Sequence, residues 1–181
     1  MQQKASNRGI RLEILGAILA GGQARRFGSD KAHALHQGRR LIDQVADALG
    51  SQSTALIVCG REEPGYGCIP DKPEKNIGPL GGLNAALQFA EEHGFTHVLS
   101  AGVDAPNVPS DLASQLSGDG ASIVSDQPVI GLWPVAIAAD LAEFIDEGGR
   151  ALYGFADRVG ARQVTIDPPL LNINRPDDLD G

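Results

Sequence analysis

The feature that most constrains the fold of this 181-residue sequence is a regular alternation of short apolar runs with amphipathic stretches. The runs that read as buried strands are Glu13–Ala20, Ala55–Cys59, His97–Leu99, Ser122–Val124 and Val129–Leu132. Between them, apolar residues recur at helical spacing, for example at positions 83, 86, 87 and 90. Strands that alternate with helices predict an α/β protein with a three-layer α/β/α, Rossmann-like architecture around a mostly parallel sheet.

The composition narrows the class of protein. A length of 181 residues fits one domain, and we expect residues 13–181 to form it behind a disordered extension, residues 1–12. No run reaches the length of a membrane span, and the polar start lacks the apolar core of a secretion signal. Two cysteines are too few for a disulfide framework, which favours a cytoplasmic protein. The formal charge of −8 argues against general nucleic-acid binding.

A glycine-rich loop follows the first predicted strand. Leu19–Lys31 reads LAGGQARRFGSDK, in which glycines let a ligand approach the main chain and the N–H groups can line an anion site. Arg25, Arg26 and Lys31 add three cations, a pattern that suits a polyphosphate. The loop matches neither common phosphate-binding pattern, G-x-x-x-x-G-K-[ST] or G-x-G-x-x-G. A surface turn with solvated charges is therefore the alternative interpretation.

Two further loops carry glycine, proline and aspartate after predicted extended segments. They are Asp71–Gly82 and Ser100–Pro109. In an open α/β sheet, ligands bind at the carboxyl ends of the strands. We therefore expect all three loops to meet at one edge of the sheet.

The glycine-rich loop resembles the signature of the nucleotidyltransferases related to molybdenum cofactor guanylyltransferase. The residues that match are Leu19, Ala20, Gly21, Gly22, Arg26, Phe27, Gly28, Asp30 and Lys31. Three further motifs of that family follow in the same order. They are Asp71 with Gly78-Pro79-Leu80-Gly81-Gly82-Leu83, then Asp104-Ala105-Pro106 with Pro109, then Asn172-Ile173-Asn174-Arg175-Pro176-Asp177-Asp178-Leu179. The four motifs cover roughly residues 14–179, which makes the resemblance far more specific than any one of them.

The resemblance implies a fold of the nucleotidyltransferase type and an activity. The expected reaction moves GMP from GTP to molybdopterin, with release of pyrophosphate and Mg²⁺ as cofactor. Besides its substrates, the protein is expected to contact other cofactor-biosynthesis proteins or molybdoenzymes transiently. Neither a nucleic acid nor a membrane is an expected partner. One departure is that Cys59 and Gly60 stand where the family often carries an asparagine that contacts nucleotide.

The resemblance also implies roles for individual residues. Arg26 and Lys31 are expected to hold the outer phosphates, and Asp104 to bind Mg²⁺; these three are the expected catalytic residues. The expected nucleotide-binding residues are Leu19, Ala20, Gly21, Gly22, Lys31, Asp71, Gly81 and Asp104. The expected acceptor-binding residues are Asn172 and Asn174, which alternate on an extended segment and so face the same way.

Each of these positions also has a purely structural interpretation. Asp104 suits an Asx turn, Asp71 suits a turn between prolines, and Asn174 suits a cap on a helix begun by Pro176. The glycine pair at 81–82 suits close helix–sheet packing. Other residues for which contact with a substrate competes with a structural role are His33, His36, Trp133 and Arg150.

Three other functions compete with guanylyl transfer. A cytidylyltransferase acting on the same cofactor would prefer CTP, although Gly21 in the tetrapeptide Leu19–Gly22 resembles the guanylyl branch. A sugar-phosphate nucleotidyltransferase would turn over a sugar phosphate, but such chains are usually longer. A non-catalytic module that delivers the cofactor would bind nucleotide without releasing pyrophosphate.

Overall fold

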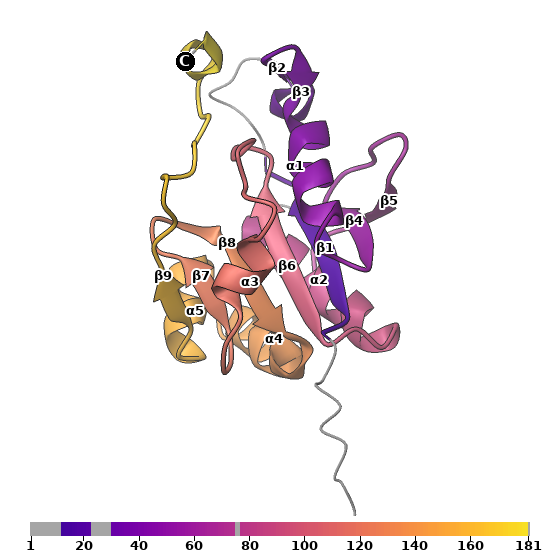
Figure 1. Ribbon diagram of the computed structural model, residues 1–181. Coiled ribbons are helices and arrows are strands. Elements are labelled where there is room, and N and C mark those ends of the chain that lie inside the picture. The colour runs from indigo at the N-terminus through magenta and orange to yellow at the C-terminus, as the bar shows by residue number, and fades with distance from the viewer. Residues whose placement is uncertain (1–11, 23–29, 75–76, 181) are drawn as a thin grey trace, which may run out of the picture.

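A seven-stranded sheet forms the centre of the protein. The computed structural model describes residues 12–22, 30–74 and 77–180. The strands lie side by side in the order β5 (Gly67–Ile69), β4 (Ala55–Cys59), β1 (Ile14–Leu19), β6 (His97–Gly102), β8 (Gln127–Pro134), β7 (Ser122–Val124) and β9 (Arg162–Val164) (Figure 1). Of the segment 1–12, only Leu12 falls within the described residues, where it packs against the core.

The sheet is mostly parallel, as the sequence predicts. β1 pairs in parallel with β4 and β6, and β4 pairs in parallel with β5. β8 is the exception, because it runs antiparallel to both β6 and β7, while β9 returns parallel to β7. Two strands are longer than expected: β6 continues through Ser100 to Gly102, and β8 begins at Gln127. Ser100 is therefore a buried core residue and does not belong to a loop.

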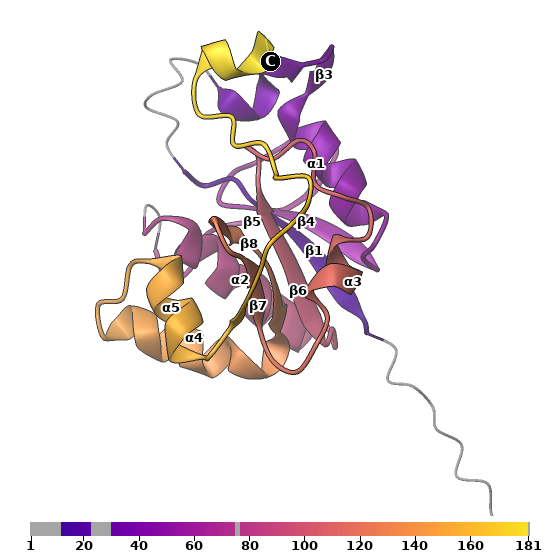
Figure 2. The same cartoon turned by 60° about the vertical axis from the view of Figure 1, so that its left-hand side comes forward.

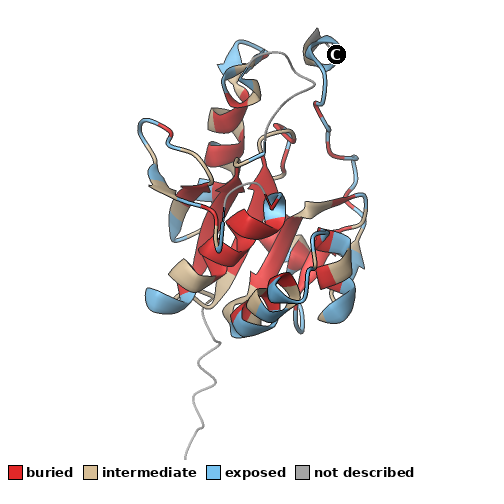
Figure 3. Cartoon of the chain, turned by 180° about the vertical axis from the view of Figure 1, so that it is seen from behind, coloured by how far each residue is buried: buried red, intermediate tan, exposed pale blue. Residues whose placement is uncertain are grey.

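Helices cover both faces of the sheet, which confirms the three-layer expectation. One apolar cluster joins the sheet to α2 (Pro79–Glu92), α4 (Ala138–Asp146) and α5 (Leu152–Arg158). A second cluster joins the other face to α1 (Leu41–Gly50) and α3 (Leu112–Leu116). Seen from behind, the strands and the inner faces of the helices are buried, whereas the outer helix faces are exposed (Figure 3).

Helix α2 shows how the sequence pattern produces the packing. Leu80, Leu83 and Leu87 recur at helical spacing and are all fully buried against the sheet. Pro79 opens the helix at its first turn, where the missing N–H group costs nothing. The positive φ of 75° at Gly78 turns the chain into the helix. The helix therefore starts beside the carboxyl ends of β1 and β4, where the predicted loops lie.

Short elements complete the end of the molecule above the sheet. They are the 3₁₀ helix η1 (Lys31–His33), the hairpin β2 (Leu35–His36) with β3 (Arg39–Arg40), the 3₁₀ helix η3 (Pro176–Asp180) and, lower down, η2 (Val135–Ile137). After β9, the chain runs along the sheet and up to the β2–β3 hairpin (Figure 2). Within the described residues, no helix combines the length and apolar character that crossing a membrane requires.

Candidate active site

The three predicted loops meet at the carboxyl edge of the parallel strands. The loop after β1 begins beside β4, because the Ala20 N–H donates to the Cys59 carbonyl at 3.0 Å. The loop after β6 reaches the end of the glycine-rich loop, because Lys31 Nζ lies 3.5 Å from Oδ2 of Asp104. Adjacent parallel strands thus bring together chain segments separated by 73 positions. The expectation of one shared edge is confirmed.

Asp71 lies among glycines at this edge. A Cβ atom at Gly60 would lie 2.5 Å from Oδ1 of Asp71 and 2.5 Å from the Gly21 Cα, and a Cβ atom at Gly21 would also collide with the Asp71 carboxylate. Asp71 is buried, with 8% of its surface exposed. Gly60 has a φ of +85°, which glycine adopts without strain. The glycines that follow β1 and β4 therefore make room for one carboxylate.

The glycine pair at the start of α2 packs closely against the sheet. A Cβ atom at Gly81 would lie 2.9 Å from Ile77 and 3.1 Å from Cβ of Asp71. A Cβ atom at Gly82 would lie 3.1 Å from the Leu19 side chain. This geometry supports the packing interpretation of the pair. Contact between Gly81 and a nucleotide stays a prediction.

Lys31 is the residue on which the site converges. Its ammonium lies 3.5 Å from Oδ2 of Asp104 and donates to Oδ1 of Asn174 at 3.3 Å. The Lys31 side chain is 13% exposed and that of Asp104 is 25% exposed. An ammonium group, a carboxylate and an amide from three distant parts of the chain therefore lie together at a place that is partly shielded from solvent.

Asp104 has unused capacity to bind a cation. Its Oδ1 atom is buried and has no hydrogen-bond partner among the described residues, which does not support the Asx-turn interpretation. Gly102 provides the room, because a Cβ atom there would lie 2.6 Å from this oxygen. A divalent metal of the Mg²⁺ type commonly takes one or two carboxylates and completes its shell with water and substrate phosphate. The described residues contain no cluster of three or more His, Cys, Asp or Glu that could hold a metal, and binding of a metal by Asp104 stays a prediction.

The C-terminal segment places two amides beside Lys31. Asn174 Nδ2 donates to Oδ1 of Asn172 at 2.7 Å, so the two side chains lie on one side of the segment as expected. The helix-capping interpretation of Asn174 is wrong, since its side chain contacts Lys31 and Asn172. The side chain that bonds the main chain before η3 is that of Asp178, which accepts the N–H groups of Asn174 and Arg175 at 2.8 Å each. These bonds hold the pKa of Asp178 below its usual value.

Several other candidates have structural roles. Trp133 is fully buried, donates to Oγ of Ser100 at 2.9 Å and stacks on Phe155, so it does not line a pocket for the acceptor. Arg150 donates to the carbonyls of Ile145 and Gly149 at the end of α4. His36 is buried, with Nδ1 3.2 Å from the Leu179 carbonyl.

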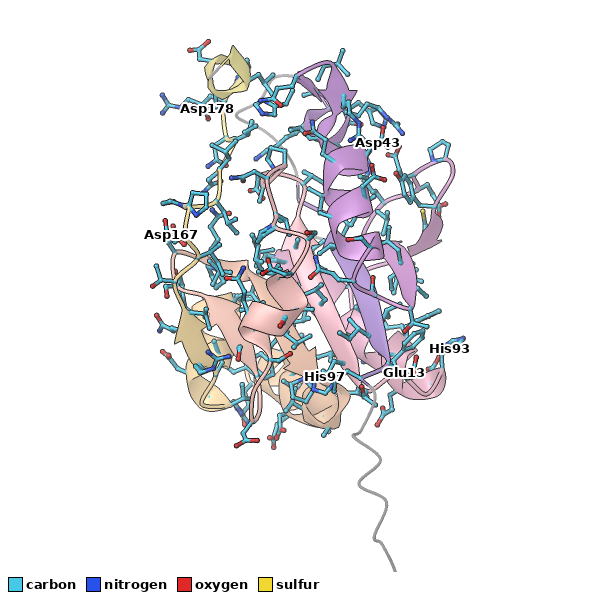
Figure 4. All side chains as sticks on the ribbon, viewed as in Figure 1. Glu13, Asp43, His93, His97, Asp167 and Asp178 are labelled. Atoms are coloured by element: carbon cyan, nitrogen blue, oxygen red, sulfur yellow. The ribbon has the colours of Figure 1, made fainter. Side chains whose placement is uncertain are left out.

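Two histidines are remote from the site. His93 and His97 lie at the opposite end of the molecule from Asp178 (Figure 4). Burial lowers the pKa of His97, because it disfavours the charged ring. The expected catalytic residue Arg26 lies outside the described residues.

Sequence reasoning missed a charged network next to Lys31. Arg61 forms a two-pronged ion pair with Asp30, with bonds of 2.7 and 2.6 Å, and its NH2 lies 3.4 Å from Oε2 of the buried Glu63. The guanidinium of Arg61 lowers the pKa of Asp30, and Asp30 in turn raises the pKa of Arg61. The position of Arg61 and Glu63 in the sequence could have pointed to this network, because both residues follow a strand that ends at the same edge.

Comparisons with known proteins agree on one family. Residues 16–161 match the family model described as the MobA-like NTP transferase domain. A relative from Cereibacter sphaeroides named molybdenum cofactor guanylyltransferase is 39% identical over 182 residues, covering 93% of this chain and 94% of that one. A relative of the same name from Rhizobium leguminosarum bv. trifolii is 35% identical, covering 93% of this chain and 91% of its own length.

Solved structures share the fold. The crystal structure of molybdopterin-guanine dinucleotide biosynthesis protein A from Archaeoglobus fulgidus superposes with a TM-score of 0.74 at 24% identity, covering 92% of this chain and 95% of that one. The 2-C-methyl-D-erythritol 4-phosphate cytidylyltransferase from Thermus thermophilus superposes with a TM-score of 0.67 at 16% identity, covering 93% and 95%. The architecture is therefore one that nucleotidyltransferases use.

Proposed function

Because the chain belongs to the family of MobA-like NTP transferase domains, we propose that it transfers GMP from GTP to molybdopterin and releases pyrophosphate. The product is the guanine dinucleotide form of the cofactor. The observation that carries the proposal is the convergence of Lys31, Asp104 and Asn174 at the edge where the glycine-rich loop begins. Relatives whose names state this activity match over more than nine-tenths of both chains, which supports the proposal further.

The reaction needs positioning more than proton transfer. An oxygen of the acceptor phosphate attacks the α-phosphorus of GTP, a new P–O bond forms, and the bond to pyrophosphate breaks. The attacking oxygen is anionic near neutral pH, so no general base is required. What limits the reaction is repulsion between two polyanions and the charge that develops on the leaving group.

Lys31 is suited to that charge. Its ammonium lies within the site and carries three donors. Oδ2 of Asp104 and Oδ1 of Asn174 lie 3.5 and 3.3 Å from it. We assign Lys31, together with Arg26, to the β- and γ-phosphates. The main-chain groups of Leu19–Gly22, with Asp71 and Gly81, are assigned to the rest of the nucleotide.

Asp104 is assigned to the metal and the C-terminal amides to the acceptor. We propose Mg²⁺ at Asp104, where it would neutralise phosphate charge. Asn172 and Asn174 face the same space and offer amide donors and acceptors, which suit a polar pterin or its phosphate. We further propose that the protein acts in the cytoplasm and hands its product over through transient contacts with other cofactor-biosynthesis proteins or molybdoenzymes.

The test is a nucleotide panel followed by turnover. Thermal unfolding is measured with Mg²⁺ and GTP, CTP, ATP or UTP in turn, since a ligand of the folded state raises stability in proportion to RT ln(1 + [L]/Kd). Pyrophosphate release is then followed with molybdopterin as acceptor. Stabilisation and turnover with GTP are expected. Turnover confined to CTP would assign the protein to cytidylyl transfer, turnover with a sugar phosphate alone to the sugar branch, and binding without turnover to a delivery role.

A further inference from the structure

A buried carboxylate lies beside the site, and the proposed reaction does not use it. The Glu63 side chain is fully buried in the loop between β4 and β5. His33 Nε2 lies 2.9 Å from its Oε2, and the NH1 group of Arg40 donates to its Oε1 at 3.0 Å. The NH2 group of Arg61 lies 3.4 Å from Oε2. Glu63 therefore joins side chains from η1, from β3 and from its own β4–β5 loop.

Such a cluster is not explained by stability alone. Burying charged groups costs solvation free energy, and a well-packed apolar set is often equally stable or more so. Arg61 carries part of this cost, because its Nε atom is buried without a hydrogen-bond partner among the described residues. What a network of this kind provides is a fixed geometry. The question is which element it fixes.

The element is η1. It is a single turn of 3₁₀ helix, too short to be stable by its own hydrogen bonds. Its N-cap residue, Asp30, accepts the Ala32 N–H at 3.2 Å and is held by both terminal nitrogens of Arg61. Its last residue, His33, is held by Glu63. Both ends of the turn are thus attached to the β4–β5 loop.

Lys31 is the first residue of this turn. Because its main chain lies between the two attachments, the direction of its side chain toward Asp104 and Asn174 depends on them. We propose that Arg61 and Glu63 are positioning residues that hold η1 so that Lys31 points at the outer phosphates of the nucleotide. The inference takes the role of Lys31 from the proposed function, whereas the attachment of η1 stands on the geometry.

The test compares Arg61→Met with a matched control, Arg39→Met. Arg39 is an exposed arginine of β3 that pairs with Asp47 of α1. Without the charged hydrogen bonds to Asp30, GTP binding is expected to weaken on the order of 10-fold, whereas GMP binding changes by less than about 2-fold. Arg39→Met should leave both affinities unchanged. Equal weakening of GTP and GMP binding by Arg61→Met would contradict the proposal.

A double-mutant cycle separates positioning from a general structural effect. If Arg61 acts through Lys31, Arg61→Met in the Lys31→Ala background should weaken GTP binding by less than about 2-fold further, because interacting residues are not additive. A full loss in that background would overturn the proposal. Should Arg61→Met fail to fold, the same double-mutant cycle is measured with Glu63→Gln, because glutamine keeps the volume of the side chain and removes its charge.

A measurement without nucleotide keeps this inference distinct from the proposed function. Hydrogen exchange at the His33 and Ala34 amides, which bond to the carbonyls of Asp30 and Lys31, reports on η1. Faster exchange there in Arg61→Met, with β1 unchanged, is expected. If the wild-type protein shows no guanylyl transfer but this exchange rises, the proposed function fails and the positioning stands. If transfer occurs while exchange and the GTP dependence are unchanged in the variant, the positioning fails and the function stands.

Discussion

The main-chain N–H of Ile173 donates a hydrogen bond of 2.9 Å to the main-chain carbonyl of Asp104. Ile173 is itself buried and packs against Leu41 of α1. The residue proposed to bind the metal and the segment proposed to bind the acceptor are therefore tied by their backbones. A change in the position of one is expected to move the other.

Removal of the Asp104 charge tests the metal assignment. In Asp104→Asn, turnover is expected to fall by at least about 10²-fold, because a group that stabilises transition-state charge is lost. The fold should persist, because asparagine has nearly the volume of aspartate and its Oδ1 can still accept a hydrogen bond from Lys31. Steady-state pyrophosphate release and thermal unfolding measure the two effects. Asp111→Asn, an exposed aspartate at the end of the same β6–α3 loop, is the control; equal kinetics for both variants would remove Asp104 from the site.

Removal of the Lys31 ammonium tests the phosphate assignment. Lys31→Ala is expected to weaken GTP binding roughly 10- to 100-fold, the range for lost hydrogen bonds to a charged group, and GMP binding much less. Titration calorimetry with both nucleotides gives the ratio. Arg158→Met serves as control, because Arg158 pairs with Glu143 and Glu147 on the far side of the sheet. Equal losses for GTP and GMP would show that Lys31 does not contact the outer phosphates.

Asp178 tests the acceptor segment. Its carboxylate holds the N–H groups of Asn174 and Arg175, so Asp178→Ala should loosen the turn that presents Asn174. The KM for molybdopterin is expected to rise about 10-fold, with the KM for GTP changing less than 2-fold, as for lost hydrogen bonds to a charged group. The neighbouring Asp177→Ala is the matched control. A rise in the KM for GTP alone would place this segment on the nucleotide side.

The pairing of Arg61 with Asp30 predicts a dependence of stability on pH. Because Arg61 lowers the folded-state pKa of Asp30 below the ordinary aspartate value of 3.8, the pairing stabilises the fold above that value. The contribution is lost as the pH falls through the lowered pKa. The difference in unfolding free energy between wild type and Asp30→Asn should therefore be constant from pH 7 to about pH 5 and shrink below about pH 4. Urea unfolding at a series of pH values measures it; a difference that grows on acidification would contradict the pairing.

The buried pair of Ser100 and Trp133 predicts a cost in the core. Ser100→Ala leaves the Trp133 Nε1–H without its acceptor, at a cost of about 1–3 kcal/mol in unfolding free energy. In the background of Trp133→Phe, which has no N–H to leave unpaired, the same serine substitution should cost less. Ser114→Ala, on the exposed side of α3, is the control. Additive effects of the two core substitutions would show that the hydrogen bond contributes little.

The sequence predicts the site edge well because that prediction depends on local patterns. The end of a β-rich apolar run locates the glycine-rich loop, and the alternation of Asn172 and Asn174 places both amides on one side. Parallel strands then bring Lys31 and Asp104 together by topology alone. The same kind of pattern predicts helix α2, since one face of it is continuously apolar.

What the sequence did not predict depends on contacts between distant segments. Three-residue edge strands such as β5 and β9 are too short to show a period. The environment of Glu63 cannot be predicted from its neighbours in the sequence, because its partners at positions 33 and 40 lie 30 and 23 residues away. The sequence leaves Trp133 as a candidate for contact with a substrate, whereas the antiparallel pairing of β8 with β6 places its side chain in the core.

The bond between Lys31 and Asn174 joins residues 143 positions apart. Contacts of that sequence separation carry a large loop-closure cost, because the chain between them must be brought together before the contact contributes any stabilisation. The site is therefore complete only when the loop near one end of the domain and the segment near the other are both in place. Recovery of turnover during refolding is therefore expected to report that the two ends of the domain have come together.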